Sequence, residues 1–192
     1  LGLFSITFSK SLNHDLEMLN SYRDFREEAE KNNFNYFLEV FNPQTKTGLN
    51  QLQLGEYVND CILKTLAGQL KSERPLFLKI AYNGPKAMEE LAGYDPKNLI
   101  VGILGGGKGT TRDCFELISK SCKYGAKVAL FGRKINLAED QQLIVKTMRD
   151  VVNGMTSTEG VKFYHDQLKK KKIKPDRSLD KDLMITEKVL KL

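Results

Sequence analysis

Tryptophan is absent from this chain of 192 residues, histidine occurs only twice, and cysteine only three times. The cysteines (Cys61, Cys114 and Cys122) are an odd number and form no C-x-x-C pair, so we expect neither a disulfide framework nor a structural zinc site. This usage predicts a reducing, cytoplasmic location. Long apolar runs are missing too. None reaches the ~20 residues that a membrane-spanning helix needs, so we expect no membrane protein.

What remains is an ordinary globular composition with a basic bias. Hydrophobic residues make up 41% and charged residues 28%, and 30 basic against 24 acidic residues leave a net charge of +6. Part of the excess lies in residues 169–174, Lys-Lys-Lys-Lys-Ile-Lys. Such a run can bind nucleic acid or anionic lipid, but no aromatic residues interleave this one as a stacking platform would require. We interpret it as solvated surface and expect neither a nucleic-acid nor a membrane partner.

Strand-like and helix-like segments alternate along the chain. Strand patterns occupy residues 3–8, 36–41, 76–81, 99–104 and 128–131. Between them, apolar residues recur at helical spacing, as at Val58, Ile62, Leu66 and Leu70. Five such units predict an α/β fold with parallel strands, either a doubly wound open sheet or a (β/α)8 TIM barrel. We expect one unit over residues 1–154 and a polar helical C-terminal extension over residues 155–192.

A glycine-rich turn follows the fourth predicted strand. It contains Gly105, Gly106, Gly107, Lys108 and Gly109, and Thr110 and Asp113 then have the spacing of a capping box. Glycines let the backbone approach a ligand closely, and a helix N-terminus attracts anions, so the turn predicts a phosphate site. The alternative is a tight turn that needs glycine only for its dihedral angles. A P-loop is disfavoured because Gly109 stands where Ser or Thr should bind magnesium.

A second polar turn follows the fifth strand. It contains Gly132, Arg133 and Lys134, and Asn136 with Glu139 three residues later predicts another helix start. In TIM barrels the turns after the last two strands often build one phosphate site. We therefore expect both turns to share an anion, which favours the barrel over the open sheet.

A lysine and a glutamate interrupt two apolar strands. Alternation places Lys79 with Phe77 and Ala81, and Glu39 with Phe37 and Phe41, on the inward face of a barrel. A desolvated lysine there can attack carbonyl carbons, and Glu39 can transfer protons. The alternative is a structural ion pair between the two. Tyr82 is a weaker candidate because its alternation points outward.

These residues resemble class I, Schiff-base aldolases. Residues 77–84 (Phe-Leu-Lys-Ile-Ala-Tyr-Asn-Gly) are similar to the strand with the imine-forming lysine, and residues 36–39 to the glutamate-bearing fifth strand. Residues 103–107 and 130–135 are similar to the phosphate-binding end of archaeal-type fructose-bisphosphate aldolases, with deoxyribose-phosphate and tagatose-bisphosphate aldolases as relatives. The resemblance covers residues 33–140. The chain departs from it at Leu104, where the family usually has Ser, and at Lys134, where it usually has Asn.

The resemblance implies a fold, a reaction and a set of site residues. The fold would be the C-terminal part of a (β/α)8 TIM barrel, about strands 4–8, and we expect the chain to be cut from a longer one. The reaction would cleave or form a carbon–carbon bond of a phosphorylated sugar through a lysine imine, in carbohydrate metabolism, without metal or cofactor. Lys79 and Glu39 would be catalytic, and the phosphate would be bound by Gly105, Gly106, Gly107, Gly132 and Arg133.

Two alternatives to this function remain. One is a sugar-phosphate-binding barrel without turnover, and the other is a nucleotide-binding protein using residues 102–108. In either case we expect a phosphorylated small molecule as ligand. Because a partial barrel exposes two sheet edges and an apolar face, we also expect a homo-oligomer.

Overall fold

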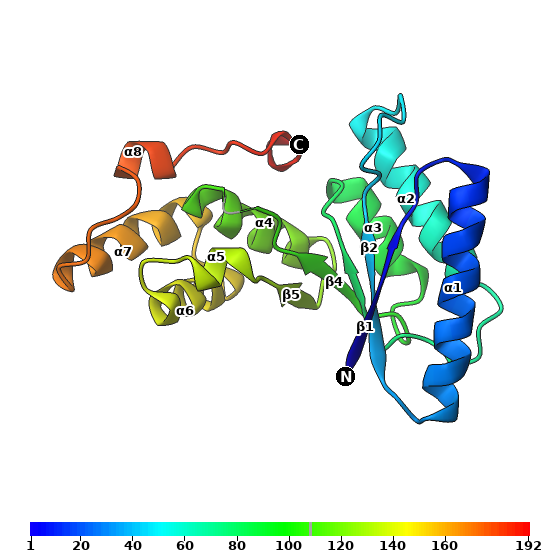
Figure 1. Cartoon of the computed structure of the whole chain (residues 1–192). Helices are drawn as coiled ribbons and strands as arrows, with labels where there is room; N and C mark the ends of the chain where they lie inside the picture. The colour runs from blue at the N-terminus through cyan, green and yellow to red at the C-terminus, as the bar shows by residue number, and fades with distance from the viewer. Residues whose placement is uncertain (108) are drawn as a thin grey trace.

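A computed structural model describes residues 1–107 and 109–192 as a mixed α/β protein (Figure 1). Its sheet has five parallel strands: β1 (Gly2–Thr7), β2 (Tyr36–Phe41), β3 (Leu78–Ile80), β4 (Val101–Leu104) and β5 (Val128–Leu130). Their order in space is their order in the chain. A doubly wound sheet reverses its strand order at a switch point, and these five strands show no reversal. The expected all-parallel α/β architecture is confirmed.

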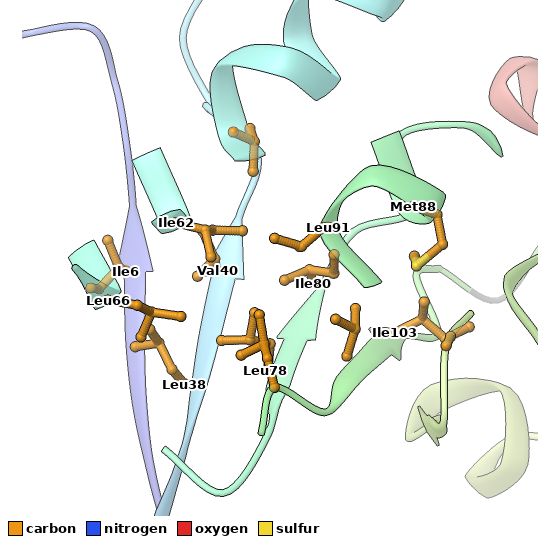
Figure 2. Close-up of a cluster of buried hydrophobic side chains, with 14 of the residues drawn as sticks. Ile6, Leu38, Val40, Ile62, Leu66, Leu78, Ile80, Met88, Leu91 and Ile103 are labelled. Carbon is orange, nitrogen blue, oxygen red and sulfur yellow. The ribbon is translucent and has the colours of Figure 1, made fainter. Parts of the chain in front are cut away.

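Three helices follow the first three strands on one side of the sheet. They are α1 (Leu12–Lys31), α2 (Gln51–Leu66) and α3 (Pro85–Tyr94) (Figure 1). The side chains of the strands that face them form the main core. Figure 2 shows Leu38 and Val40 of β2 and Leu78 and Ile80 of β3 packed against Ile62 and Leu66 of α2 and Leu91 of α3. None of these strand side chains is more than 3% exposed.

The opposite face of the sheet adds nothing to this core. Its side chains include Phe37 and Phe77, which stack with ring centroids 4.7 Å apart, and the partly exposed Leu3 and Phe41. None of these four side chains belongs to the buried clusters found among the described residues. The alternation in the sequence therefore separated the two faces correctly.

The remaining helices extend beyond β5 and build a core of their own. They are α4 (Thr111–Lys123), α5 (Arg133–Asn136), α6 (Gln141–Val152), α7 (Ser157–Lys170) and α8 (Leu179–Asp182), followed by a short 3₁₀ helix, η1 (Lys188–Lys191) (Figure 1). Phe115 of α4, Ile144 of α6 and Tyr164 of α7 are fully buried where these helices meet. α7 contributes Val161, Tyr164 and Leu168 to this core, and the division into residues 1–154 and a polar helical extension over residues 155–192 stays a prediction.

Two expectations about helix ends are wrong. Leu70 does not continue the apolar stripe of α2, because the helix ends at Leu66 and Gly68 adopts a φ of +75°. Asn136 does not start a helix. It ends the short α5, and α6 begins after Asp140, whose side chain accepts a hydrogen bond from the backbone N–H of Leu143. The end of α2 is followed by Gly68 in its left-handed conformation, and the start of α6 is capped by Asp140 instead of Asn136.

We predict that two leucines, Leu78 in β3 and Leu76 just before it, contribute unequally to the free energy of unfolding. Leu78 is fully buried, and replacing it with Ala should lower the free energy of unfolding by about 2–5 kcal/mol, through lost burial and the cavity left behind. Leu76 is 49% exposed, and its replacement should change the free energy of unfolding by less than about 0.5 kcal/mol. Denaturant unfolding measures both. Equal losses would mean that the main core does not lie where the structure has it.

Candidate functional site

An ion pair lies on the helix-free face of the sheet. The Nζ of Lys79 is 2.6 Å from the Oε1 of Glu39, and the two side chains are 22% and 7% exposed. The hydroxyl of Ser5 donates a hydrogen bond to the other carboxylate oxygen, Oε2, at 3.0 Å. Both oxygens of Glu39 are therefore engaged, one by a cation and one by a neutral donor.

The register of the sheet creates this arrangement. Ser5, Glu39 and Lys79 are direct partners across β1, β2 and β3, and Gly102 follows on β4. A Cβ on Gly102 would lie 2.8 Å from the carbonyl oxygen of Leu78, so the strand carries glycine at the place where the backbones come closest. Residues in register on parallel strands point to the same face, which brings the three polar side chains into one row.

This geometry allows proton transfer as well as structural pairing. An amine must lose a proton before its nitrogen can attack a carbonyl carbon. The carboxylate of Glu39 is at hydrogen-bond distance from the Nζ of Lys79, where a general base has to be. The sequence left open whether the two residues act in chemistry or as an ion pair, and their contact is compatible with both.

The two polar turns that the sequence predicted to be neighbours are in contact. The guanidinium of Arg133 donates a hydrogen bond from Nη2 to the carbonyl oxygen of Gly106 at 3.1 Å. Gly106 has a φ of +63°, in the left-handed region that glycine adopts easily. A Cβ on Gly105 would lie 2.4 Å from the ring of Phe131, so this glycine permits the close approach of the turns. Lys108, in the same turn, lies outside the described residues.

The N-terminus of α4 already binds a carboxylate of the protein itself. The capping box predicted for Thr110 and Asp113 is confirmed. The next amide, the N–H of Thr111, donates to the Oδ1 of Asp182 at 2.7 Å, and the Nε2 of His165 lies 2.9 Å from the Oδ2 of Asp182. Burial raises the pKa of Asp182, but the hydrogen bonds from Thr111 and His165 outweigh it and leave that pKa below its ordinary value. This amide of α4 is therefore not available to an external phosphate.

A cleft of about 460 Å³ opens at the carboxyl ends of β3 and β4, a size within the range of small-molecule sites. Gly105, Gly106 and Gly107 line one side, and residues 186–190 line another. Ala81 and Leu104 also line it, two residues beyond Lys79 and Gly102 on the same strands. The cleft thus begins about 6–7 Å further along the strands than the ion pair.

The predicted site residues consequently fall into two neighbouring groups. The cleft is lined by the three glycines, whereas Lys79, Glu39, Gly132 and Arg133 are not among its lining residues. Lys79 and Glu39 contact each other, and Arg133 contacts the glycine turn from outside the cleft. Tyr82 is 5% exposed and belongs to the main core, as its alternation predicted, and it also lines the cleft.

Sequence reasoning missed Ser5 and the burial of Lys134. Ser5 lies on the same face of its strand as Leu3 and Thr7, in register with Glu39. The alternation that selected Glu39 could therefore have identified Ser5 too. Lys134 is 6% exposed, and its Nζ donates to the Oγ1 of Thr111 at 3.2 Å. Burial lowers the pKa of Lys134, because the charged ammonium form is disfavoured away from water. No sequence pattern marks it, since it lies in the short α5 and contacts Thr111 of α4, which is distant in the chain.

The described residues contain neither a membrane-spanning helix nor a cluster of metal ligands. No helix within residues 1–107 and 109–192 is long and apolar enough to cross a membrane. No group of three or more His, Cys, Asp and Glu side chains in the part of the chain that the structure describes could hold a metal ion.

Neither a protein-family model nor a curated protein matches this sequence.

Proposed function

We propose that this protein is a class I aldolase-like lyase that acts on a phosphorylated sugar or ketose through an imine on Lys79. The observation that carries the proposal is the 2.6 Å contact between the Nζ of Lys79 and the Oε1 of Glu39 on the open face of a parallel sheet. Such a pair supplies a nucleophile and its base in one contact.

The reaction follows from these two groups. Glu39 accepts a proton from Lys79, and the free Nζ attacks the carbonyl carbon of the substrate to give a carbinolamine. The carbinolamine hydroxyl leaves as water, taking up the proton that Glu39 returns, and an iminium forms. Glu39, again a carboxylate, then takes the proton of the substrate hydroxyl on the β carbon; the carbon–carbon bond breaks, that carbon leaves as an aldehyde, and the electron pair moves into the iminium to give an enamine on Lys79. Glu39 returns the proton to the enamine carbon, and water hydrolyses the resulting iminium to release the second product. Ser5, bonded to the other oxygen of Glu39, orients the carboxylate during these steps.

The glycine turn supports a phosphorylated substrate. Gly105, Gly106 and Gly107 line the cleft beyond the ion pair, and Arg133 is held at this turn by its bond to Gly106. A guanidinium beside an accessible glycine backbone suits a phosphate group. A substrate with its carbonyl at Lys79 would extend its phosphate along the strands toward this turn.

The same proposal includes the fold. Five parallel strands in sequential order, with the functional groups at their carboxyl ends, suit strands 4–8 of a (β/α)8 barrel. The other strands would come from polypeptide outside these 192 residues and would cover the helix-free face. They would also pair with β1 and β5, which have only one neighbour each.

A second function, sugar-phosphate binding without turnover, is favoured by one specific observation. Lys79 already has a carboxylate partner, and it is not among the residues that line the cleft. A purely structural ion pair would have the same appearance, and the cleft would then bind a phosphorylated ligand unchanged.

Trapping the imine distinguishes these two functions. Incubation with dihydroxyacetone phosphate followed by borohydride should leave a reduced adduct on Lys79, located by peptide mass spectrometry. Lys79→Met should abolish the adduct, and Glu39→Gln should slow its formation by about 10²–10⁴-fold, the usual contribution of a general base. Lys134 serves as the internal comparison. An adduct on Lys134 and none on Lys79 would contradict the proposal.

Removing the arginine at the glycine turn tests the phosphate site. Arg133→Ala should weaken binding of dihydroxyacetone phosphate by about 1.5–3 kcal/mol, the range for a charge-assisted hydrogen bond. Binding of unphosphorylated dihydroxyacetone should not change. Arg149→Ala, an exposed arginine on α6, is the matched control for the loss of one positive charge. Equal losses for both ligands would make Arg133 a structural residue only.

The barrel is tested by how the 192 residues behave alone. With two unpaired edges and with Leu3 and Phe41 exposed, they should self-associate in size-exclusion chromatography and unfold without one sharp transition. A longer polypeptide that closes the barrel should elute as a single species and unfold in one sharp transition. A monomer of the 192 residues with one cooperative transition would instead show that five strands form a complete open sheet.

A further inference from the structure

One carboxylate holds the last residues of the described chain against the cleft. Asp113 accepts hydrogen bonds from the backbone N–H of Thr186 at 2.7 Å, the hydroxyl of Thr186 at 2.5 Å and the backbone N–H of Glu187 at 3.2 Å. Its role in the capping box of α4 needs only the N–H of Thr110. Burial raises the pKa of Asp113, but these hydrogen bonds outweigh it, so the pKa lies below its ordinary value and the side chain is ionised at neutral pH.

The other attachments of residues 186–192 are apolar. Leu190 is 3% exposed and enters the main core, Val189 packs against that core, and Leu192 is 64% exposed. Among the described residues, the only hydrogen bonds that join this segment to the rest of the chain are the three to Asp113. The preceding anchor is separate, since Asp182 is buried and bonded to Thr111 and His165. The hydrogen bonds that hold α8 are thus different from those that hold the segment.

The same segment forms a wall of the cleft. Residues 186–190 line it together with Gly105, Gly106 and Gly107. The attachment point is also next to the glycine turn, because Asp113 and Gly109 line the same cleft and a Cβ added to Gly109 would meet the Oδ2 of Asp113 at 3.2 Å. A ligand that rearranges the glycine turn would thus act on Asp113, and through it on the segment.

We propose that residues 186–192 are a lid on this cleft, with Asp113 as its latch and Leu190 as its apolar anchor. The lid opens when both contacts break, admits the ligand and closes on it. The ligand class, a phosphorylated carbonyl compound, rests on the proposed function. The latch itself depends only on the contacts of Asp113 and Leu190.

Amide hydrogen exchange on the 192-residue chain tests the latch without a ligand. Asp113→Asn keeps the cap of α4, where the backbone N–H of residue 113 donates to Thr110, but it removes the charge that binds the lid. Exchange at residues 186, 187 and 190 should become at least tenfold faster, while amides in the middle of α4 keep their rates. Leu190→Ala should act in the same way, and Leu192→Ala, on the exposed neighbour, should have no effect. Unchanged lid amides, or equal acceleration throughout the protein, would overturn the proposal.

The ligand is tested in a second arm. Millimolar dihydroxyacetone phosphate should slow exchange at residues 186, 187 and 190 in the unmodified protein, and unphosphorylated dihydroxyacetone should not. An imine on Lys79 with no change in lid exchange would overturn the lid alone. Slower lid exchange without any imine on Lys79 would leave the lid standing and refute the lysine chemistry. No response of the lid to the phosphorylated ligand overturns the proposal whether or not the imine forms.

Discussion

The register of the parallel sheet is the constraint on which the rest of the structure depends. The helix-facing rows, such as Leu38 beside Leu78 and Val40 beside Ile80, are almost fully buried. A slip of one residue in β3 would turn Leu78 outward and push Lys79 into the helices, at the cost of burying an unpaired charge. Packing on the covered face therefore specifies which polar residues meet on the open face, and it places Ser5, Glu39 and Lys79 in one row.

Carboxylates of the protein itself shape the carboxyl end of this sheet. Asp182 takes the amide at the start of α4 that an external phosphate could have used, and Asp113 fastens the segment that walls the cleft. Both have a lowered pKa because several donors converge on each of them. The glycine turn is left with its backbone and with Arg133 for an anion.

The sequence predicted what depends on local pattern and missed what depends on distant contacts. Strand alternation identified the face of Lys79, and the spacing of Thr110 and Asp113 identified a capping box, because both follow from backbone periodicity. The contact of Arg133 with Gly106 followed from the rule that neighbouring parallel strands end at one edge. No local signal foretold that Asp182, about seventy residues later, would bind Thr111, or that Lys134 would be buried. Those outcomes depend on how α6 and α7 pack onto α4.

The central claim is that one substrate joins Lys79 to the glycine turn. The most direct test is a crystal structure of the borohydride-reduced adduct formed with dihydroxyacetone phosphate, on the longest polypeptide that contains these residues. We predict a covalent bond between the Nζ of Lys79 and the former carbonyl carbon, with Glu39 beside it and the phosphate at Gly106 and Arg133. An adduct on another lysine, or a phosphate directed away from the glycine turn, would contradict the account.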